Sequence, residues 1–143
     1  MPPLVKRLGL VIFAGVVAAI VQVIAIYLFG ALGLFRLIEL PTPTLGLFWS
    51  IKQVLWGGVY ALLFLVPVLT QSRQVMRGLN VGLLRAAVTL FVINPMEGHG
   101  MLGLGLGFGW PVIVILFNLL WGAVAGWTFG RVTGELPDEE LMA

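Results

Sequence analysis

The chain contains apolar stretches long enough to cross a lipid bilayer, and the clearest is the segment 110–129, which runs for 20 residues without a charged side chain. A transmembrane helix needs about 20 predominantly apolar residues to cross a hydrocarbon core about 30 Å thick. Hydrophobic residues make up 60% of the 143 residues, charged residues make up 10%, and the mean hydropathy is +1.09. These values lie outside the range of soluble domains. The sequence therefore predicts an all-α integral membrane protein.

Four such stretches divide the chain, and we predict a single four-helix transmembrane bundle over residues 1–134. The first stretch follows Lys6 and Arg7, as in a signal peptide, but it is 27 residues long and lacks a cleavage-site pattern, so we expect it to be retained. Pro41 and Pro43 interrupt the pattern after it, and Asn94-Pro95 ends the third stretch, because proline lacks an N–H donor and disfavours helix before it. The predicted spans are about 8–34, 45–69, 75–93 and 110–130, followed by an acidic cytoplasmic tail at 135–143.

Lysine and arginine in the short connections predict the orientation, because they are retained on the cytoplasmic side of a membrane. Arg36 lies on one side of the four-span arrangement, and the opposite side carries most of the other basic residues: Lys6, Arg7, Arg73, Arg77 and Arg131. We therefore expect a multi-pass protein of the bacterial inner (cell) membrane with both termini in the cytoplasm. The lipid bilayer is its expected partner, and the net charge of +2 is too small to indicate nucleic acid.

Glycines at four-residue spacing mark two predicted helices. Helices in lipid associate through close backbone approach at small residues, because lipid tails are as apolar as leucine. The spacing allows two interpretations: contacts inside one four-helix bundle, or the seam of a homo-oligomer or of a larger membrane complex. The glycines are Gly78 and Gly82 in the third span and Gly122, Gly126 and Gly130 in the fourth, with Asn118 on the same face one turn earlier.

Two basic residues lie at membrane depth in the predicted spans, where an unpaired charge costs at least about 2.5–3.5 kcal/mol on insertion scales. The stem of Lys52 is long enough to extend back to the outer interface. Arg85 lies on the small-residue face of the third span and is expected either inside the bundle or, facing lipid, extended to the inner interface. A buried Arg85 needs acceptors, and the sequence offers four kinds: Gln22, Asn118, the carbonyls freed by Pro95, and Glu97 if its loop folds inward.

The segment INPMEGHGMLGLGLGFGWP separates the third and fourth spans and has glycine at every second position from Gly103 to Gly109. This spacing matches no single helical face, so the shared property of these glycines is permissive backbone geometry. Irregular backbone is tolerated at membrane depth only where protein buries it or it lines water. We predict that 97–109 is a Gly-rich re-entrant loop over the outer end of the bundle; a plain outer loop on the headgroups is the alternative.

Glu97 and His99 lie in this loop, but the sequence provides no conventional catalytic or metal site. A zinc site needs three or four protein ligands, and the chain has one histidine and no cysteine. His99 is a weak candidate for a cofactor ligand, as the single axial ligand of a tetrapyrrole. The glycine series lacks the strand-to-helix context of a nucleotide fingerprint. We therefore expect no enzyme activity, no metal and no cofactor.

The order of features resembles small uncharacterised bacterial inner-membrane proteins of the YagU type. The residues that carry the resemblance are PTPT after the first span, WGGVY in the second, RGLNVG and INP around the third, and a last span rich in tryptophan and glycine. The resemblance covers most of the chain as a layout. It carries over no functional residue.

Two functions fit these observations. The first is a small non-catalytic accessory or structural subunit that packs through its glycine-rich helix faces against itself or a larger membrane complex. The alternative is a small channel or transporter with a path bordered by polar candidates in the spans and the loop: Lys52, Arg85, Glu97 and His99. The accessory role needs only the packing faces, whereas the transport role needs a continuous polar lining, so we rank the accessory role first.

Overall fold

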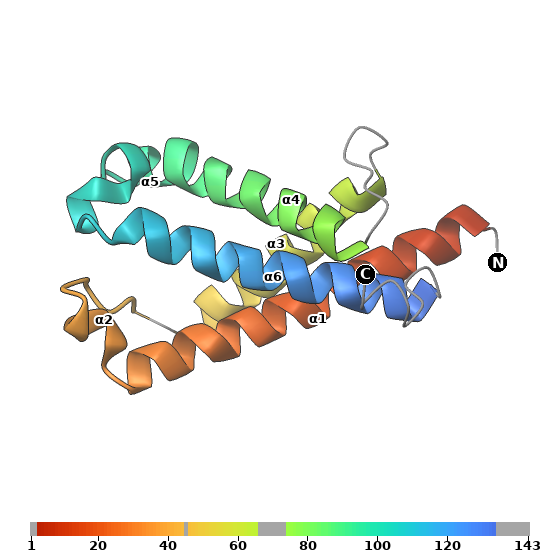
Figure 1. Ribbon diagram of the computed structural model, residues 1–143, viewed down its shortest axis with the longest axis horizontal. Coiled ribbons are helices and arrows are strands. Elements are labelled where there is room, and N and C mark those ends of the chain that lie inside the picture. The colour runs from red at the N-terminus through yellow and green to blue at the C-terminus, as the bar shows by residue number, and fades with distance from the viewer. Residues whose placement is uncertain (1–2, 45, 66–73, 134–143) are drawn as a thin grey trace.

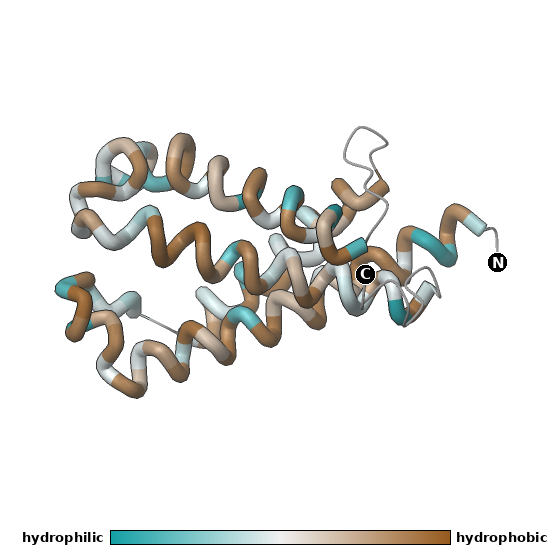
Figure 2. The backbone as a smooth tube through the Cα atoms, viewed as in Figure 1, coloured by the Kyte–Doolittle hydropathy of each residue, from teal (hydrophilic) through white to brown (hydrophobic). Residues whose placement is uncertain are grey.

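The computed structural model describes residues 3–44, 46–65 and 74–133, and these residues form helices and no strands. Four helices are long and apolar enough to cross a membrane: Pro3–Ala31, Leu47–Leu65, Gln74–Met96 and Trp110–Thr133. The predicted all-α class with four long helices is therefore confirmed. Brown, apolar positions recur along the helices in Figure 2, with white and teal positions between them. Many large apolar side chains also lie exposed on the surface, as expected for helices that face lipid.

Three helix pairs make the main contacts of the bundle. Helix α4 (Gln74–Val88) packs against α6 (Trp110–Thr133), α6 packs against α1 (Pro3–Ala31), and α1 packs against α3 (Leu47–Ala61). Contacts between α3 and α4 are sparse. Helix α1 begins at the end of the bundle where α6 ends (Figure 1), and we call this the terminal end. The opposite end, which we call the loop end, holds α2 (Leu34–Leu37) and α5 (Asn94–Met96).

The first two spans differ in detail from their predicted bounds. Helix α1 starts at Pro3 and stops at Ala31, because Gly33 adopts a left-handed conformation with φ 73° before α2 begins. Helix α3 tightens into a 3₁₀ turn, η1, at Leu62–Leu65. The remainder of the predicted second span and the predicted acidic tail lie outside the described residues.

The third helix continues through Asn94-Pro95, so the prediction that this pair ends it at residue 93 is wrong. Its last full turn, η3 (Thr89–Ile93), is a π-helix, and α5 follows with Pro95 in its first turn. A proline ring normally clashes with the carbonyl four residues earlier, here that of Phe91. We attribute the continuation to the wider π turn, which changes the hydrogen-bond pattern before the proline.

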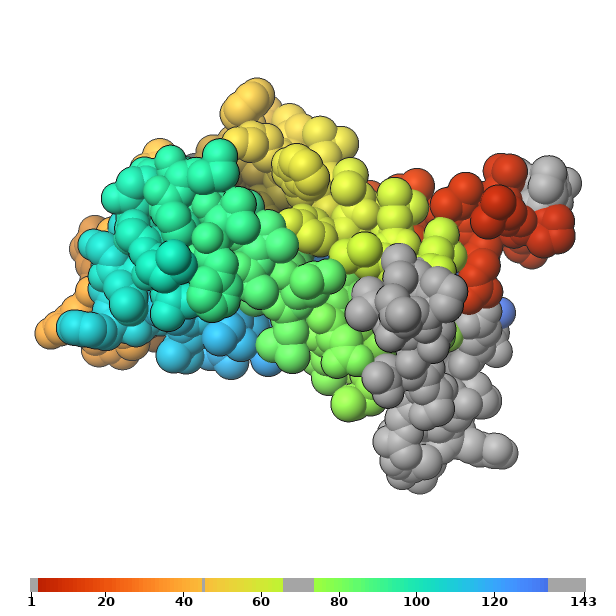
Figure 3. Space-filling view, turned by 90° about the horizontal axis from the view of Figure 1, so that it is seen from above, coloured from red at the N-terminus to blue at the C-terminus, as the bar shows by residue number. Residues whose placement is uncertain are grey.

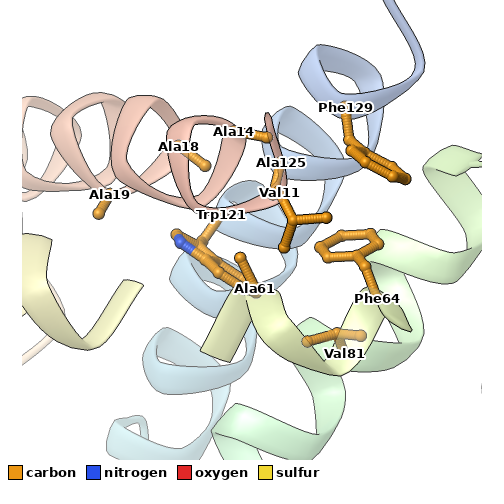
Figure 4. Close-up of a cluster of buried hydrophobic side chains, with 10 residues drawn as sticks. All are labelled: Val11, Ala14, Ala18, Ala19, Ala61, Phe64, Val81, Trp121, Ala125 and Phe129. Atoms are coloured by element: carbon orange, nitrogen blue, oxygen red, sulfur yellow. The ribbon is translucent and has the colours of Figure 1, made fainter. Parts of the chain in front are cut away.

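The terminal half of the bundle contains a dense core of small and aromatic side chains, which we call the small-residue core (Figure 4). Trp121 is fully buried at its centre, and its Nε1 donates to the carbonyl oxygen of Gly15 at 3.2 Å. Small residues let α1, α3 and α6 approach closely around this ring. The members of the core are Val11, Ala14, Ala18, Ala19, Ala61, Phe64, Val81, Trp121, Ala125 and Phe129.

Glycines bring α4 and α6 into direct backbone contact. A Cβ atom at Gly78 would meet the carbonyl oxygen of Gly122, and a Cβ atom at Gly122 would meet that of Gly78. Gly82 lies in the same way against the carbonyl oxygen of Asn118, and Gly126 against that of Gln74. These four glycine positions therefore face the inside of the bundle.

The segment between the third and fourth helices is a compact, hydrogen-bonded structure. It contains a short 3₁₀ segment, η4 (Met101–Leu106), interrupted by left-handed geometry at Leu102 and Gly103. The amide of His99 donates to the carbonyl oxygen of Asn94 at 2.9 Å, and the amide of Gly105 donates to that of His99 at 2.8 Å. Gly103 is buried against the side chains of Asn94 and Trp110. The glycines thus allow the loop to fold tightly onto the loop end.

Candidate ligand-binding site

A cavity of about 560 Å³ opens at the loop end of the bundle. Its volume lies within the usual range of small-molecule sites, roughly 300–1,000 Å³. Apolar walls come from α1 and α6, including Ile26, Ile113 and Phe117. The polar residues that line it are Thr44, Gln53, Thr89, Asn94, Glu97 and His99.

The cavity exists because the loop-end halves of the helices do not close on one another. Helix α3 packs on α1 but scarcely touches α4, and Figure 3 shows α3 (yellow) at one edge of the molecule with α6 (blue) visible at the opposite edge. Trp49 on α3 and Val114 on α6 consequently line a shared space.

Arg85 lies directly beneath this cavity in a network that joins four helices. Its Nη1 donates to Oε1 of Gln22 on α1 at 3.1 Å, and its Nη2 donates to Oε1 of Gln53 on α3 at 3.0 Å. The Nε2 atom of Gln22 donates in turn to the carbonyl oxygen of Phe117 on α6 at 3.0 Å. Gln53 accepts the bond from Nη2 of Arg85 and also lines the cavity. Its side chain therefore separates the guanidinium group from the open space.

Two aromatic rings hold the guanidinium group. Its Cζ atom lies 5.0 Å from the ring centre of Trp121 and 5.4 Å from that of Tyr60. Cation–π contacts of this kind stabilise a desolvated cation by about 2 kcal/mol. Arg85 is only 5% exposed. It therefore lies inside the bundle, and the lipid-facing alternative does not apply.

The buried charge of Arg85 has no counter-ion among the described residues. The acceptors that it uses are two neutral amides, and the carboxylate of Glu97 is paired instead with His99. Of the predicted acceptors, Gln22 is used. Asn118 and Glu97 are not: the Nδ2 atom of Asn118 donates to the carbonyl oxygen of Val114 in its own helix at 2.8 Å, and Glu97 lies against His99. Two amides offset only part of the cost of burying a cation.

The π turn shapes the wall above Arg85. Thr89 begins this turn, lines the cavity, and donates from Oγ1 to the carbonyl oxygen of Arg85 at 3.1 Å. Single π turns in α-helices occur frequently at functional sites. Further along the same wall, Nδ2 of Asn94 and Nε1 of Trp110 are buried, and neither has an acceptor among the described residues.

Glu97 and His99 lie at the mouth of the cavity. His99 Nε2 is 3.6 Å from Glu97 Oε2, and both side chains are partly exposed, at 37% and 60%. No group of three or more histidine, cysteine, aspartate or glutamate side chains suitable for a metal occurs in the part of the chain that the structure describes. The two partly exposed side chains at the mouth therefore make only a weak electrostatic contact.

Lys52 lies away from the cavity, in contrast to its neighbour in the sequence, Gln53. Its side chain is exposed, and its Nζ atom is 6.0 Å from the ring centre of Phe48, one turn closer to the loop end. The structure therefore brings Arg85, Glu97 and His99 to one cavity and its floor but leaves Lys52 outside it. Gly130, the last of the spaced glycines, is buried on α6.

Sequence reasoning did not identify Gln53, Asn94 and Trp110 as members of one site. Gln53 and Asn94 are visible as rare polar residues in apolar spans. Their convergence depends on the rotation of each helix about its axis, which periodicity leaves open when most faces are apolar. No family model, curated protein sequence or solved structure matches this chain, so the resemblance to the YagU type rests on layout alone.

Proposed function

We propose that the chain is a small non-catalytic integral membrane protein that binds an amphipathic molecule in the loop-end cavity. The observation that supports this proposal is the cavity itself, with apolar walls and a polar floor made by Gln53 and Thr89. Small-molecule sites commonly combine an apolar lining with a few fixed polar groups. The proposal includes the bacterial inner membrane, cytoplasmic termini and an outward-facing loop end.

The accessory-subunit role receives less support from the geometry. It depended on glycine faces free to pack against a partner, whereas Gly78, Gly82, Gly122 and Gly126 contact one another's helices within the chain. A channel or transporter would need a passage beyond Arg85. The fully buried side chains of the small-residue core, including Trp121, lie between the cavity floor and the terminal end. Binding therefore requires no change in this packing, and transport requires the core to open.

A neutral fluorescent amphiphile, N-decyl dansylamide, tests the binding proposal with protein in phosphatidylcholine nanodiscs. We expect its emission to rise above that in empty nanodiscs and to fall back in Ile26→Trp, since Ile26 lies one turn beyond Gln22 and lines the cavity. Ile24→Trp is the matched control, because Ile24 is 53% exposed on the same helix. Equal emission from both variants would overturn the proposed site.

Orientation is tested separately, because the native chain has no cysteine. Cysteines introduced at Thr42 and Glu97, which are exposed and follow α2 and α5 in the chain, should react with an impermeant thiol reagent added outside intact cells. A cysteine at Leu4, 64% exposed at the terminal end, should not react. Labelling of the Leu4 position alone would invert the proposed topology.

A further inference from the structure

We infer that the ligand of the loop-end cavity carries an anionic group, a carboxylate or a phosphate ester, and that Arg85 is its counter-charge. The inference rests on the proposed function, because it names the ligand class of the same cavity. The first observation is a buried positive charge that lacks a counter-ion among the described residues. Arg85 is only 5% exposed, and no carboxylate of the described residues pairs with it. An anionic ligand supplies the missing charge, and arginine presents donors that match carboxylate and phosphate oxygens.

Gln53 provides the route from the cavity to the guanidinium group. It lines the cavity, and its Oε1 atom occupies the acceptor position on Nη2 of Arg85. Rotation of this side chain releases Nη2 to a ligand oxygen. Gln22 remains in place on Nη1, because its own Nε2 atom is held by the carbonyl oxygen of Phe117. The guanidinium group thus keeps its position while one of its donors changes partner.

Two further buried hydrogen-bond donors, on Asn94 and Trp110, lie near the cavity but against Gly103 of the loop, so Arg85 remains the group that faces the ligand through Gln53. The buried Nδ2 of Asn94, a residue 4% exposed, and the buried Nε1 of Trp110 have no acceptor among the described residues. Glu97 is the carboxylate at the mouth, but its exposed charge is screened by water and paired with His99. The buried cation therefore acts in the less polar environment and dominates the interaction with an anion.

The remaining lining fits an apolar chain. Ile26 and Phe117 stand next to the floor, and Ile113 continues the same wall toward the mouth. A ligand with its anionic group at Gln53 and its chain along this wall buries both parts in matching surroundings. A single-chain acid and an anionic bilayer lipid both have this chemistry, so the test separates the two sources.

Competition against the dansyl probe compares decanoate with its neutral analogue decanamide in phosphatidylcholine nanodiscs. We expect the parent protein to prefer decanoate by about tenfold or more, the usual gain from a charge-assisted hydrogen bond. Arg85→Gln should bind decanamide as before and lose the preference. Lys52→Gln is the matched control. It removes an exposed cation next to Gln53 in the sequence of α3, and it should retain the preference for decanoate. Gln53→Leu should increase the preference, since it removes the competing acceptor.

A second measurement does not depend on the probe. Decanoate should raise the thermal unfolding midpoint of the parent more than decanamide does, and Arg85→Lys should retain part of this difference even if Arg85→Gln fails to fold.

Phosphatidylglycerol nanodiscs that displace the probe in an Arg85-dependent manner would identify bilayer lipid as the source. Equal binding of decanoate and decanamide by the parent would overturn the anionic ligand but leave the cavity proposal intact. Binding of both that is unaffected by Ile26→Trp would overturn the proposed function.

Discussion

The terminal half and the loop-end half of the bundle use the same helices but pack them differently. In the terminal half, glycine and alanine bring backbones together, and Val81, Trp121 and Ala125 are fully buried. In the loop-end half, α3 and α4 make few contacts and a cavity of about 560 Å³ remains. The closely packed small-residue core therefore adjoins the open loop-end cavity in one small bundle. Arg85 lies at the boundary between the two.

The largest effect is expected from a side chain placed between the closest backbones. Gly122→Leu should destabilise the fold by about 3 kcal/mol, the upper end of the usual overpacking cost, because its Cβ would meet the carbonyl oxygen of Gly78. Gly9→Leu is the control, since a Cβ at Gly9 meets nothing within 4 Å. Free energies of unfolding would come from sodium dodecyl sulfate titrations in mild detergent. Equal stability of the two variants would contradict the close α4–α6 contact.

Adding the same bulk to each half compares them directly. Val81→Phe should cost about 2 kcal/mol, because Val81 is fully buried in the small-residue core. Val114→Phe should cost less than about 1 kcal/mol, because Val114 borders the cavity and the new ring has space to enter. The same titrations measure both. A larger loss from Val114→Phe would mean that the cavity is not available to the ring.

A smaller difference, about 1 kcal/mol, is expected between two glycines of the loop that covers the cavity wall. Gly98 and Gly103 both have left-handed backbones, with φ 83° and 68°. An alanine at either position costs about 1–2 kcal/mol of backbone strain. Gly103→Ala should cost about 1 kcal/mol more, because its Cβ would meet the side chains of Asn94 and Trp110, whereas Gly98 has open space. Hydrogen exchange at the His99 and Gly105 amides measures the difference, and identical exchange in the two variants would contradict the packing of Gly103.

The smallest effect is expected at Lys52. Its exposed side chain makes no contact with the cavity, so Lys52→Gln should change the free energy of unfolding by less than about 0.5 kcal/mol. Probe emission should also stay unchanged. Gln53→Leu, one residue later, alters the cavity floor and is the positive control for the binding measurement. A loss of probe binding in Lys52→Gln would bring Lys52 into the site.

The sequence by itself determined the helical class and much of the placement of the helices. Apolar runs of about 20 residues leave few alternatives to long helices, and the four-residue spacing of Gly78 and Gly82, and of Gly122 and Gly126, is enough to indicate contact faces. Arg85 also lies on such a face, but the sequence left open whether it points into the bundle or toward lipid, and the structure buries it. Local patterns suffice here because helix formation and close approach depend on residues one turn apart.

Only the tertiary structure decided which helices meet and what lies between them. The partners of Arg85 are Gln22 and Gln53, which lie 63 and 32 residues away in the chain. The continuation of the third helix through Pro95 depends on a π turn that the sequence does not mark. The cavity arises from the divergence of α3 and α4. Helices that are apolar on most faces have no hydrophobic stripe to fix their rotation, so side-chain packing between them decides the site.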